Sequence, residues 1–204
     1  MNTAGLPLPY TQPAAAGIYL AACLFWLIPE TLGFYRQMAK AARRTDAVLD
    51  RGSLGILIGL QWVGIGLNFA LAGFVPAAAI RWQRGALFLL GVVCILAGVA
   101  FRQYAIRTLG RFFTRKVAVT ASQPVVQRGP YRLIRHPAYT GTLLTMLGVG
   151  LALTNWASLA ALLACAISGH LYRVSVEEQA LIRALGEPYI DYMRHTWRFI
   201  PGVY

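Results

Sequence analysis

Long apolar blocks separated by short polar strips dominate the sequence. Three of these blocks each supply the roughly 20 apolar residues that a helix needs to cross the hydrocarbon core of a bilayer. They cover approximately residues 14–35, 53–75 and 85–106. A fourth apolar region, 138–172, contains no acidic side chain and is interrupted at Thr154-Asn155, a pair that favours a turn. The fourth region therefore predicts two short helices joined as a hairpin.

Each limb of this hairpin is near or below the usual spanning length, so a tight re-entrant hairpin competes with two full crossings. We expect two crossings. The pattern thus predicts an all-α integral membrane protein with about five transmembrane helices. Three of them lie in an N-terminal part, 1–106. The C-terminal part, 107–204, is the candidate catalytic region, with a basic loop, the hairpin, a cytoplasmic helix and a tail.

Composition excludes an ordinary soluble domain. Hydrophobic residues make up 57% of the 204 residues and charged residues only 13%, against about 25% charged in soluble domains. Mean hydropathy is +0.54. The net charge of +12 favours contact with anionic lipid headgroups over nucleic acid, because the basic residues lie in strips between apolar blocks. Cys23, Cys94 and Cys165 all lie in apolar blocks without metal-ligand spacing, so we expect neither a disulfide nor a metal site.

The basic residues also predict the orientation in the membrane. The loops at 36–51 and 107–137 are rich in Lys and Arg, whereas the loop between them contains only Arg81 and Arg84. Because cytoplasmic loops carry the excess of basic residues, the N-terminus is predicted outside and both basic loops in the cytoplasm. With five spans, the tail at 173–204 also faces the cytoplasm.

Polar residues collect at both ends of the predicted hairpin. Arg128 to Gly141 reads RGPYRLIRHPAYTG directly before it. After it, His170, Arg173 and Glu177 are spaced to share one helix face, where an Arg173–Glu177 ion pair is available. Glu178 points elsewhere around the helix, and we expect it to pair with an arginine of the third loop.

Two further features qualify as candidates. Glu30 is an acidic residue inside the first apolar block, and intramembrane carboxylates are functional candidates by default; Arg36 is near enough in sequence to pair with it. The stretch 186–202 is too aromatic for a disordered tail. We expect it to pack onto the cytoplasmic face.

Four short motifs in order resemble one known family. They are Gly129-Pro130-Tyr131 with the Arg135–Tyr139 run, Glu177-Glu178-x-x-Leu181, Gly186-x-x-Tyr189-x-x-Tyr192, and Arg198-Phe199-Ile200-Pro201. Together, wrapped around an apolar hairpin, they resemble the isoprenylcysteine carboxyl methyltransferase family and its phospholipid methyltransferase relatives. The resemblance covers about Phe113 to Pro201, nearly half of the chain.

This resemblance implies a cytoplasmic pocket for S-adenosylmethionine between the loop before the hairpin and the helix after it. It also implies that Arg173 orients the carboxylate of the substrate, and Glu178 is a second candidate catalytic residue. The cofactor contacts that it implies are Gln123, Pro124, Val125, Val126, Tyr131, His136, Pro137, Ala138, Tyr139 and Glu177.

The reaction implied is carboxyl O-methylation of an isoprenylcysteine-type lipidic substrate drawn from the bilayer. A carboxylate is already ionised at pH 7, so alignment and desolvation suffice without a general base. N-methylation of a phospholipid amine, or methylation of another small amphiphile, is the alternative; an amine must lose a proton, for which Glu178 or His136 is available. A non-catalytic membrane scaffold is the alternative from a different class. No glycine-rich Rossmann turn follows a strand in this sequence.

Overall fold

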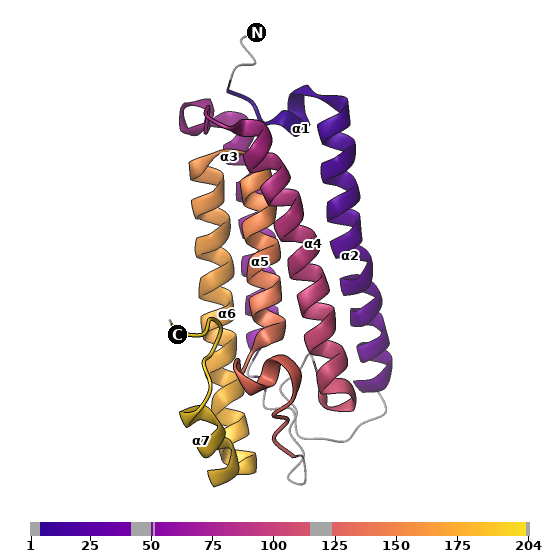
Figure 1. Cartoon of the computed structure of the whole chain (residues 1–204), viewed down its shortest axis with the longest axis vertical. Coiled ribbons are helices and arrows are strands. Elements are labelled where there is room, and N and C mark those ends of the chain that lie inside the picture. Colours follow the sequence, from indigo (N-terminus) through magenta and orange to yellow (C-terminus); the bar gives the residue numbers. More distant parts are fainter. Residues whose placement is uncertain (1–4, 42–49, 51, 115–123, 203–204) are drawn as a thin grey trace.

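The computed structural model describes residues 5–41, 50, 52–114 and 124–202, and in this part of the chain it is all-α, as predicted. Five long helices run side by side as a bundle (Figure 1). They are α2 (Pro13–Ala41), α3 (Ser53–Phe74), α4 (Arg84–Leu109), α5 (Pro137–Ala152) and α6 (Trp156–Leu185). The short helices are α1 (Leu8–Thr11) and α7 (Glu187–Arg194), with 3-10 turns η1 (Pro76–Ala78), η2 (Gly110–Phe112) and η3 (Gly129–Arg132).

The predicted hairpin is present, and its turn lies at the predicted residues. Thr154 has a φ of 47°, which ends α5. Asn155 then caps α6, because its side-chain oxygen accepts a hydrogen bond of 3.1 Å from the Ser158 N–H. Ile80 N–H donates to the Thr154 carbonyl at 2.8 Å, and the Asn155 amide donates to the Val75 carbonyl at 2.9 Å. The hairpin therefore reaches the connection between α3 and α4.

Within the described residues, four helices are long and apolar enough to cross a bilayer: α2, α3, α4 and α6. Large apolar side chains such as Leu20 and Trp62 are exposed on the bundle, which suits contact with lipid. The chain is thus an integral membrane protein. The 16 residues of α5 extend about 24 Å at 1.5 Å per residue, less than the roughly 30 Å hydrocarbon core, so the number of five crossings stays a prediction.

Glycines allow the closest helix contact, which joins α4 to α5. A Cβ atom on Gly98 would lie 2.6 Å from the Gly141 carbonyl oxygen, and one on Gly148 would lie 2.5 Å from the Gly91 carbonyl oxygen. Neither position has room for a side chain. In a bilayer, such small residues let two backbones approach and gain dispersion contact. The start of α5 is therefore held tightly against α4.

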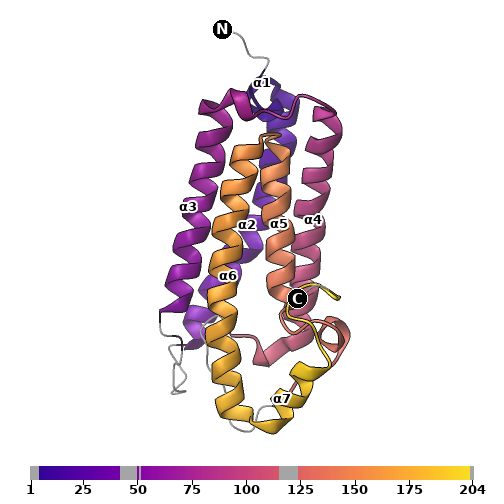
Figure 2. The same cartoon turned by 90° about the vertical axis from the view of Figure 1, so that its left-hand side faces the viewer.

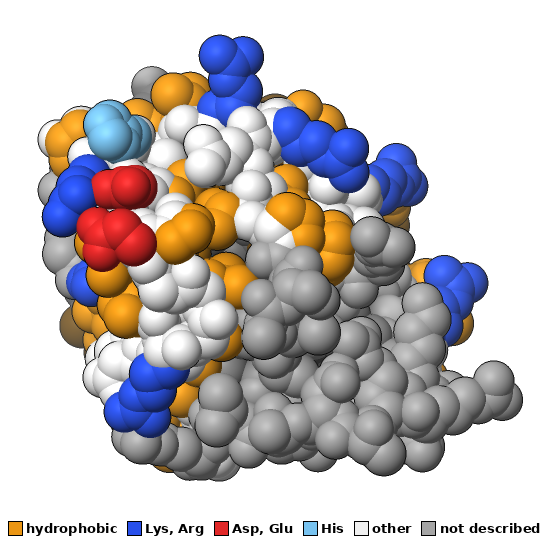
Figure 3. All heavy atoms as spheres, turned by 90° about the horizontal axis from the view of Figure 1, so that it is seen from below, with side chains coloured by type: hydrophobic (Ala, Val, Ile, Leu, Met, Phe, Trp, Pro, Cys, Tyr) orange, Lys and Arg blue, Asp and Glu red, His pale blue; other side chains and the backbone are white. Residues whose placement is uncertain are grey.

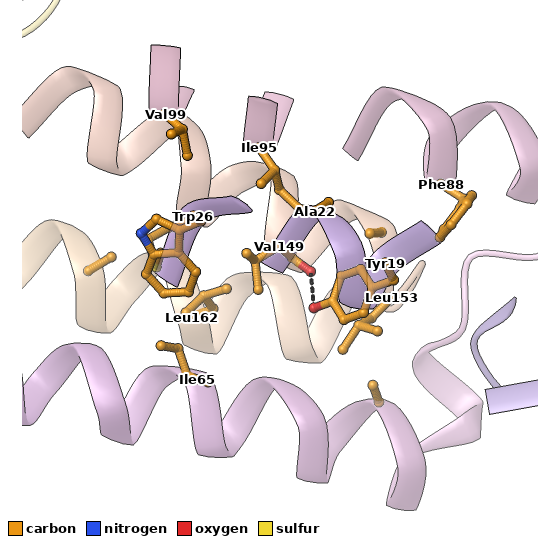
Figure 4. Packing of buried hydrophobic residues seen from close by; sticks show 14 of the residues in the cluster. Tyr19, Ala22, Trp26, Ile65, Phe88, Ile95, Val99, Val149, Leu153 and Leu162 are labelled. Carbon is orange, nitrogen blue, oxygen red and sulfur yellow. Dashed lines mark hydrogen bonds between the residues drawn. The ribbon is translucent and has the colours of Figure 1, made fainter. Parts of the chain in front are cut away.

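The hydrophobic core joins α2, α3, α4, α5 and α6. Trp26 and Tyr19 of α2 point into it (Figure 4), and the Tyr19 hydroxyl donates to the Val149 carbonyl at 3.3 Å. Ile95 of α4 and Leu162 of α6 complete its centre and are fully buried. Packing of this kind fixes the rotation of each helix, and so decides which polar side chains meet at the helix ends.

The ends of α4 and α6, the starts of α3 and α5, and α7 all lie at one end of the bundle (Figures 1 and 2). The α3–α4 connection and α1 lie at the opposite end. The two basic loops are therefore attached to the same end, as predicted, and basic side chains lie at several places along the edge of the described part of the face seen there (Figure 3). Which side of the membrane this end faces stays a prediction.

Candidate active site

A cavity opens at the α7 end of the bundle, where the predicted site residues collect. It is open to solvent, and its empty space together with its open mouth amounts to about 850 Å³. Its walls come from the end of α4, the segment before α5, the last turns of α6, and α7. The lining residues are Leu109, Phe112, Phe113, Thr114, Val125, Val126, Tyr131, Arg135, His136, Ala138, Tyr139, Arg173, Glu177, Leu181, Leu185, Tyr189 and Tyr192.

The segment before α5 is shaped by its glycine and prolines. Gly129 has a φ of +56°, a conformation that L side chains rarely adopt, and it opens the η3 turn. This turn buries Tyr131, whose carbonyl accepts a 2.7 Å hydrogen bond from the Tyr192 hydroxyl. Pro137 then begins α5 at a position where its missing N–H costs nothing. The η3 turn and the start of α5 at Pro137 together bring His136, Ala138 and Tyr139 to the cavity wall.

Tyr139 is the central contact of the site. Its hydroxyl donates to Glu177 Oε2 at 2.7 Å and accepts from Arg173 Nε at 3.3 Å. Its ring stacks on His136, with centroids 5.7 Å apart, and meets His170 edge-on at 5.3 Å. Rings on two sides and polar partners at the tip therefore fix Tyr139 between Arg173 and Glu177.

Arg173 has a second set of partners at the start of α3. Its Nη1 pairs with the Asp50 carboxylate and also contacts the Ser53 hydroxyl. The Arg173 side chain is almost completely buried, at 1% exposed. Asp50 was not among the residues predicted from the sequence. An acid just before an apolar helix has a local explanation, because Asp50 Oδ2 accepts from the Leu54 N–H in the first turn of α3 at 3.2 Å.

Glu178 forms a buried cluster with cations. Its Oε1 accepts from Arg135 Nε at 2.9 Å and lies 3.3 Å from His136 Nε2. Its Oε2 pairs with Arg198 Nη2 at 2.9 Å. The expected partner in the third loop, an arginine, is therefore confirmed. Glu178 is not among the cavity-lining residues, and both of its oxygens have cationic partners, an arrangement that suits a positioning residue better than the base available to the amine alternative.

The C-terminal tail packs beside this cluster, as expected. Trp197 N–H donates to the Leu133 carbonyl at 2.9 Å, and its own carbonyl accepts from the Arg135 N–H at 2.7 Å. The Phe199 carbonyl accepts from the Thr140 hydroxyl at 2.8 Å. The tail thereby fixes the segment that carries His136 and Tyr139.

A buried ion pair supports the start of α5 from the other side. Arg102 of α4 pairs with the Glu30 carboxylate, with Nη2 and Oε2 3.1 Å apart, and its Nη1 donates to the Ala138 carbonyl at 3.1 Å. The candidate Glu30 thus has Arg102 as its partner, where the sequence suggested Arg36. Because Ala138 lines the cavity, this pair holds part of the wall in place.

Seven of the ten predicted cofactor contacts line the cavity, together with Arg173. These seven are Val125, Val126, Tyr131, His136, Ala138, Tyr139 and Glu177. Pro124 and Pro137 are not among the lining residues, and Pro137 opens α5; their contact with the cofactor stays a prediction. Gln123 lies outside the described residues. Sequence reasoning missed Arg135, Tyr189 and Tyr192 as wall residues, although all three belong to the motifs quoted above.

The tyrosines of the wall are neutral hydrogen-bonding groups. Burial raises the pKa of Tyr131, and the nearby charge of Glu177 raises it further. Burial likewise raises the pKa of Tyr189 and of Tyr192. Their hydroxyls therefore stay protonated at physiological pH and can donate hydrogen bonds. Among the described lining residues, Glu177 is the one carboxylate.

Residues 89–183 match the family model of the Isoprenylcysteine carboxyl methyltransferase (ICMT) family. The chain is 31% identical over 115 residues to "Protein-S-isoprenylcysteine O-methyltransferase A" of Arabidopsis thaliana, covering 55% of this chain and 58% of the relative. It is 30% identical over 120 residues to the Dictyostelium discoideum "Protein-S-isoprenylcysteine O-methyltransferase", covering 58% and 51%. The chain thus spans little more than half the length of these relatives.

A solved structure shares the fold. It is described as the eukaryotic intramembrane Ras methyltransferase ICMT (isoprenylcysteine carboxyl methyltransferase), and it superposes with a TM-score of 0.55 at 25% identity. The likeness covers 73% of this chain and 52% of that structure. The matched 89–183 region contains the α5–α6 hairpin, Arg173 and Glu177, but not Asp50.

Proposed function

Because residues 89–183 match the model of the isoprenylcysteine carboxyl methyltransferase family and the chain resembles its curated and solved members, we propose that this chain belongs to that family and is an S-adenosylmethionine-dependent methyltransferase. Its acceptor is the carboxylate of an isoprenylcysteine-type lipidic molecule drawn from the bilayer, and its cavity faces the cytoplasm. The observation that carries the proposal is the Arg173–Tyr139–Glu177 chain at the cavity wall. It places an anion-binding group beside a cation-binding group.

The cavity suits the methyl donor. S-adenosylmethionine joins a positively charged sulfur, an aromatic base and an amino acid end, so its site needs a carboxylate, apolar or aromatic walls, and polar groups. Glu177 provides the carboxylate and Arg135 a guanidinium. Val125, Val126 and Leu181 provide apolar wall, and Tyr131 and His136 provide rings. When bound, S-adenosylmethionine supplies an activated methyl group on a cationic sulfur.

Glu177 holds the cationic donor in this proposal. A carboxylate at the wall of a partly enclosed site interacts with a positive charge more strongly than it does in water. The 2.7 Å bond from Tyr139 fixes the direction of its Oε2, so the charge is already oriented before the donor arrives. That preorganisation lowers the cost of binding.

Arg173 orients the acceptor. A guanidinium group can hold a carboxylate through two parallel N–H···O bonds, which fixes both position and plane. Arg173 and Glu177 lie one helical turn apart on α6, and Arg173 is the one nearer the centre of the apolar bundle. A lipidic acceptor can therefore leave its chain among the helices while its carboxylate meets Arg173. The carboxylate is already ionised, so alignment and exclusion of water are the contributions required of these residues.

Glu178 acts by positioning other residues. Its contacts with Arg135, His136 and Arg198 connect the loop before α5, α6 and the tail, and so hold His136 and Arg135 at the cavity wall. Carboxyl methylation needs no base, so a positioning role for Glu178 is compatible with the proposed reaction.

The product class tests the proposal. Purified protein in nanodiscs is supplied with S-adenosylmethionine labelled in the methyl group and with N-acetyl-S-farnesylcysteine, its methyl ester, or phosphatidylethanolamine. We expect labelling of the free acid alone. A carboxyl methyl ester releases labelled methanol in alkali, whereas an N-methylated amine does not. Alkali-stable label on phosphatidylethanolamine would favour the amine reaction, and absence of label on every acceptor would favour the scaffold.

A further inference from the structure

Asp50 is paired with the guanidinium group of Arg173, the group that binds the acceptor carboxylate in the proposed reaction. It lies at the start of α3, outside the region that matches the family model, and its Oδ1 pairs with Arg173 Nη1. Both side chains are buried, and Asp50 is the anion in the contact. An aspartate carboxylate and the carboxylate of a prenylcysteine are the same chemical group. The protein thus presents its own carboxylate to Arg173.

We propose that Asp50 holds the place of the acceptor carboxylate on Arg173 and is displaced by it, so that Asp50 sets the affinity for the acceptor. This inference rests on the proposed function. It adds a specificity-determining residue from the start of α3 to a site otherwise built by the end of α4, the segment before α5, α5, α6 and α7.

The geometry of the guanidinium group makes the two carboxylates compete. A carboxylate that accepts two parallel bonds needs either the Nε and Nη2 edge or the Nη1 and Nη2 edge. Tyr139 already contacts Nε, and Asp50 contacts Nη1. An acceptor carboxylate can form two parallel bonds with one edge of the guanidinium group only if the Tyr139 contact or the Asp50 contact on that edge is shared or lost. An acceptor carboxylate beside Asp50 would also be repelled by the Asp50 carboxylate, and this repulsion is strong because the site is buried.

Asp50 is the partner that can withdraw. Tyr139 is fixed by the His136 ring, the His170 ring and the 2.7 Å bond to Glu177. The contacts of Asp50 include the first turn of α3, with the Leu54 N–H at 3.2 Å and the Ser53 hydroxyl at 3.4 Å. These groups belong to the first turn of α3, where the helix dipole favours an anion. When Arg173 turns to the acceptor, the Asp50 carboxylate keeps a stabilising environment.

The same exchange discriminates acid from ester. A free acid carries the charge that can replace Asp50 on Arg173, whereas the neutral methyl ester cannot compete for the guanidinium. Asp50 therefore regains Arg173 once the acceptor is methylated, which favours release of the ester. The expected signature is a binding preference for acid over ester that depends on the charge at position 50.

Asp50→Asn tests the inference. Asparagine keeps the shape and a side-chain oxygen that can accept from the Leu54 N–H, but it removes the competing charge. Binding of N-acetyl-S-farnesylcysteine and of its methyl ester is measured without S-adenosylmethionine, and the KM for the acid is measured with it. We expect the affinity for the acid to rise about tenfold, the scale of one close charge contact in a partly screened site. The affinity for the ester should stay constant, and KM should fall.

Two variants complete the design. Asp191→Asn makes the same chemical change at an exposed residue of α7 that pairs with Arg194, and should leave the acid-to-ester preference unchanged. Asp50→Ser also removes the charge, so it should reproduce Asp50→Asn. S-adenosylmethionine affinity reports whether each variant is folded.

Weaker or unchanged binding of the acid by both Asp50 variants would overturn the inference; weaker binding would make Asp50 a positioning residue for Arg173. In the double variant with Arg173→Ala, the effect of Asp50→Asn should disappear. Failure of the unmodified protein to methylate the acid is a separate result, which would overturn the proposed function. The binding measurement does not depend on turnover, so the two failures are distinguishable.

Discussion

Tyr139 and Glu177 are joined by a 2.7 Å hydrogen bond from the phenol to the carboxylate. The same hydroxyl accepts from Arg173 at 3.3 Å, so it lies between the residues that the sequence suggested as a direct ion pair. In the proposed enzyme Arg173 serves the acceptor and Glu177 the methyl donor. One hydroxyl thus connects the two subsites, and its removal should affect both.

Tyr139→Phe should weaken S-adenosylmethionine binding about threefold to tenfold, because Glu177 loses a hydrogen bond that fixes its direction. It should also lower turnover, since Arg173 loses its Nε partner. Calorimetry and initial rates measure the two effects. Tyr172→Phe removes a hydroxyl from a half-exposed tyrosine of α6 and should change neither. Unchanged affinity in Tyr139→Phe would contradict the bridging role.

Glu177→Gln should weaken S-adenosylmethionine binding by about 1.5–3 kcal/mol, roughly ten- to a hundredfold, through loss of a charge-assisted contact with a cationic ligand. The control is Glu187→Gln, which removes an exposed carboxylate that pairs with Arg194 on α7. A calorimetric dissociation constant equal to that of the unmodified protein would remove Glu177 from the site.

Arg173→Ala should have an effect that depends on the acceptor. Cofactor affinity should be nearly intact, while turnover of a carboxylate acceptor should fall about a hundredfold, since misplacement by about 1 Å can cost that much. An amine acceptor should be affected far less. Arg183→Ala, at an exposed position of α6, controls for loss of a basic residue.

The opposing interpretation is that Arg173 only orients Glu177 through Tyr139. A double-mutant cycle on cofactor affinity with Arg173→Ala and Glu177→Gln separates the two roles. Strong coupling, without an acceptor-dependent loss of turnover, would leave Arg173 as a positioning residue for Glu177.

Glu178→Gln should destabilise the folded protein and loosen the tail. The variant leaves the buried guanidinium of Arg135 without its anionic partner, and breaking such a pair costs about 3–5 kcal/mol. Thermal unfolding in detergent and proteolysis at residues 196–200 measure this. Asp191→Asn, whose exposed ion pair contributes about 0–1 kcal/mol, is the control. Equal melting temperatures for the two variants would show that the cluster contributes little.

The predicted topology can be tested with single cysteines in a background lacking Cys23, Cys94 and Cys165. Arg132→Cys is on the α7 end and Trp82→Cys on the opposite end, and both positions are exposed. An impermeant maleimide should label Trp82→Cys in intact cells and Arg132→Cys only after permeabilisation. The reverse pattern would place the cavity outside the cell.

Much of the fold was predictable because it depends on local sequence. Apolar blocks of spanning length gave α2, α3 and α4 close to their observed bounds, and Thr154-Asn155 marked the hairpin turn. A turn and a helix cap depend on residues within a few positions of each other, so a short segment of sequence is enough to predict them. The motif residues before α5 and at Glu177 gathered at one cavity for a related reason, since they lie at the adjacent ends of one hairpin.

The sequence by itself determined the class of protein, the order of its helices and the end of the bundle where the site lies. Only the tertiary structure decided which charges meet there. Asp50 pairs with Arg173 across 123 positions and Glu30 with Arg102 across 72, and the local contact of Asp50 with the first turn of α3 concealed its second role. Such pairs depend on the rotation and spacing of packed helices, set by contacts such as Gly98 with Gly141. These contacts are collective properties of the core that no local pattern specifies.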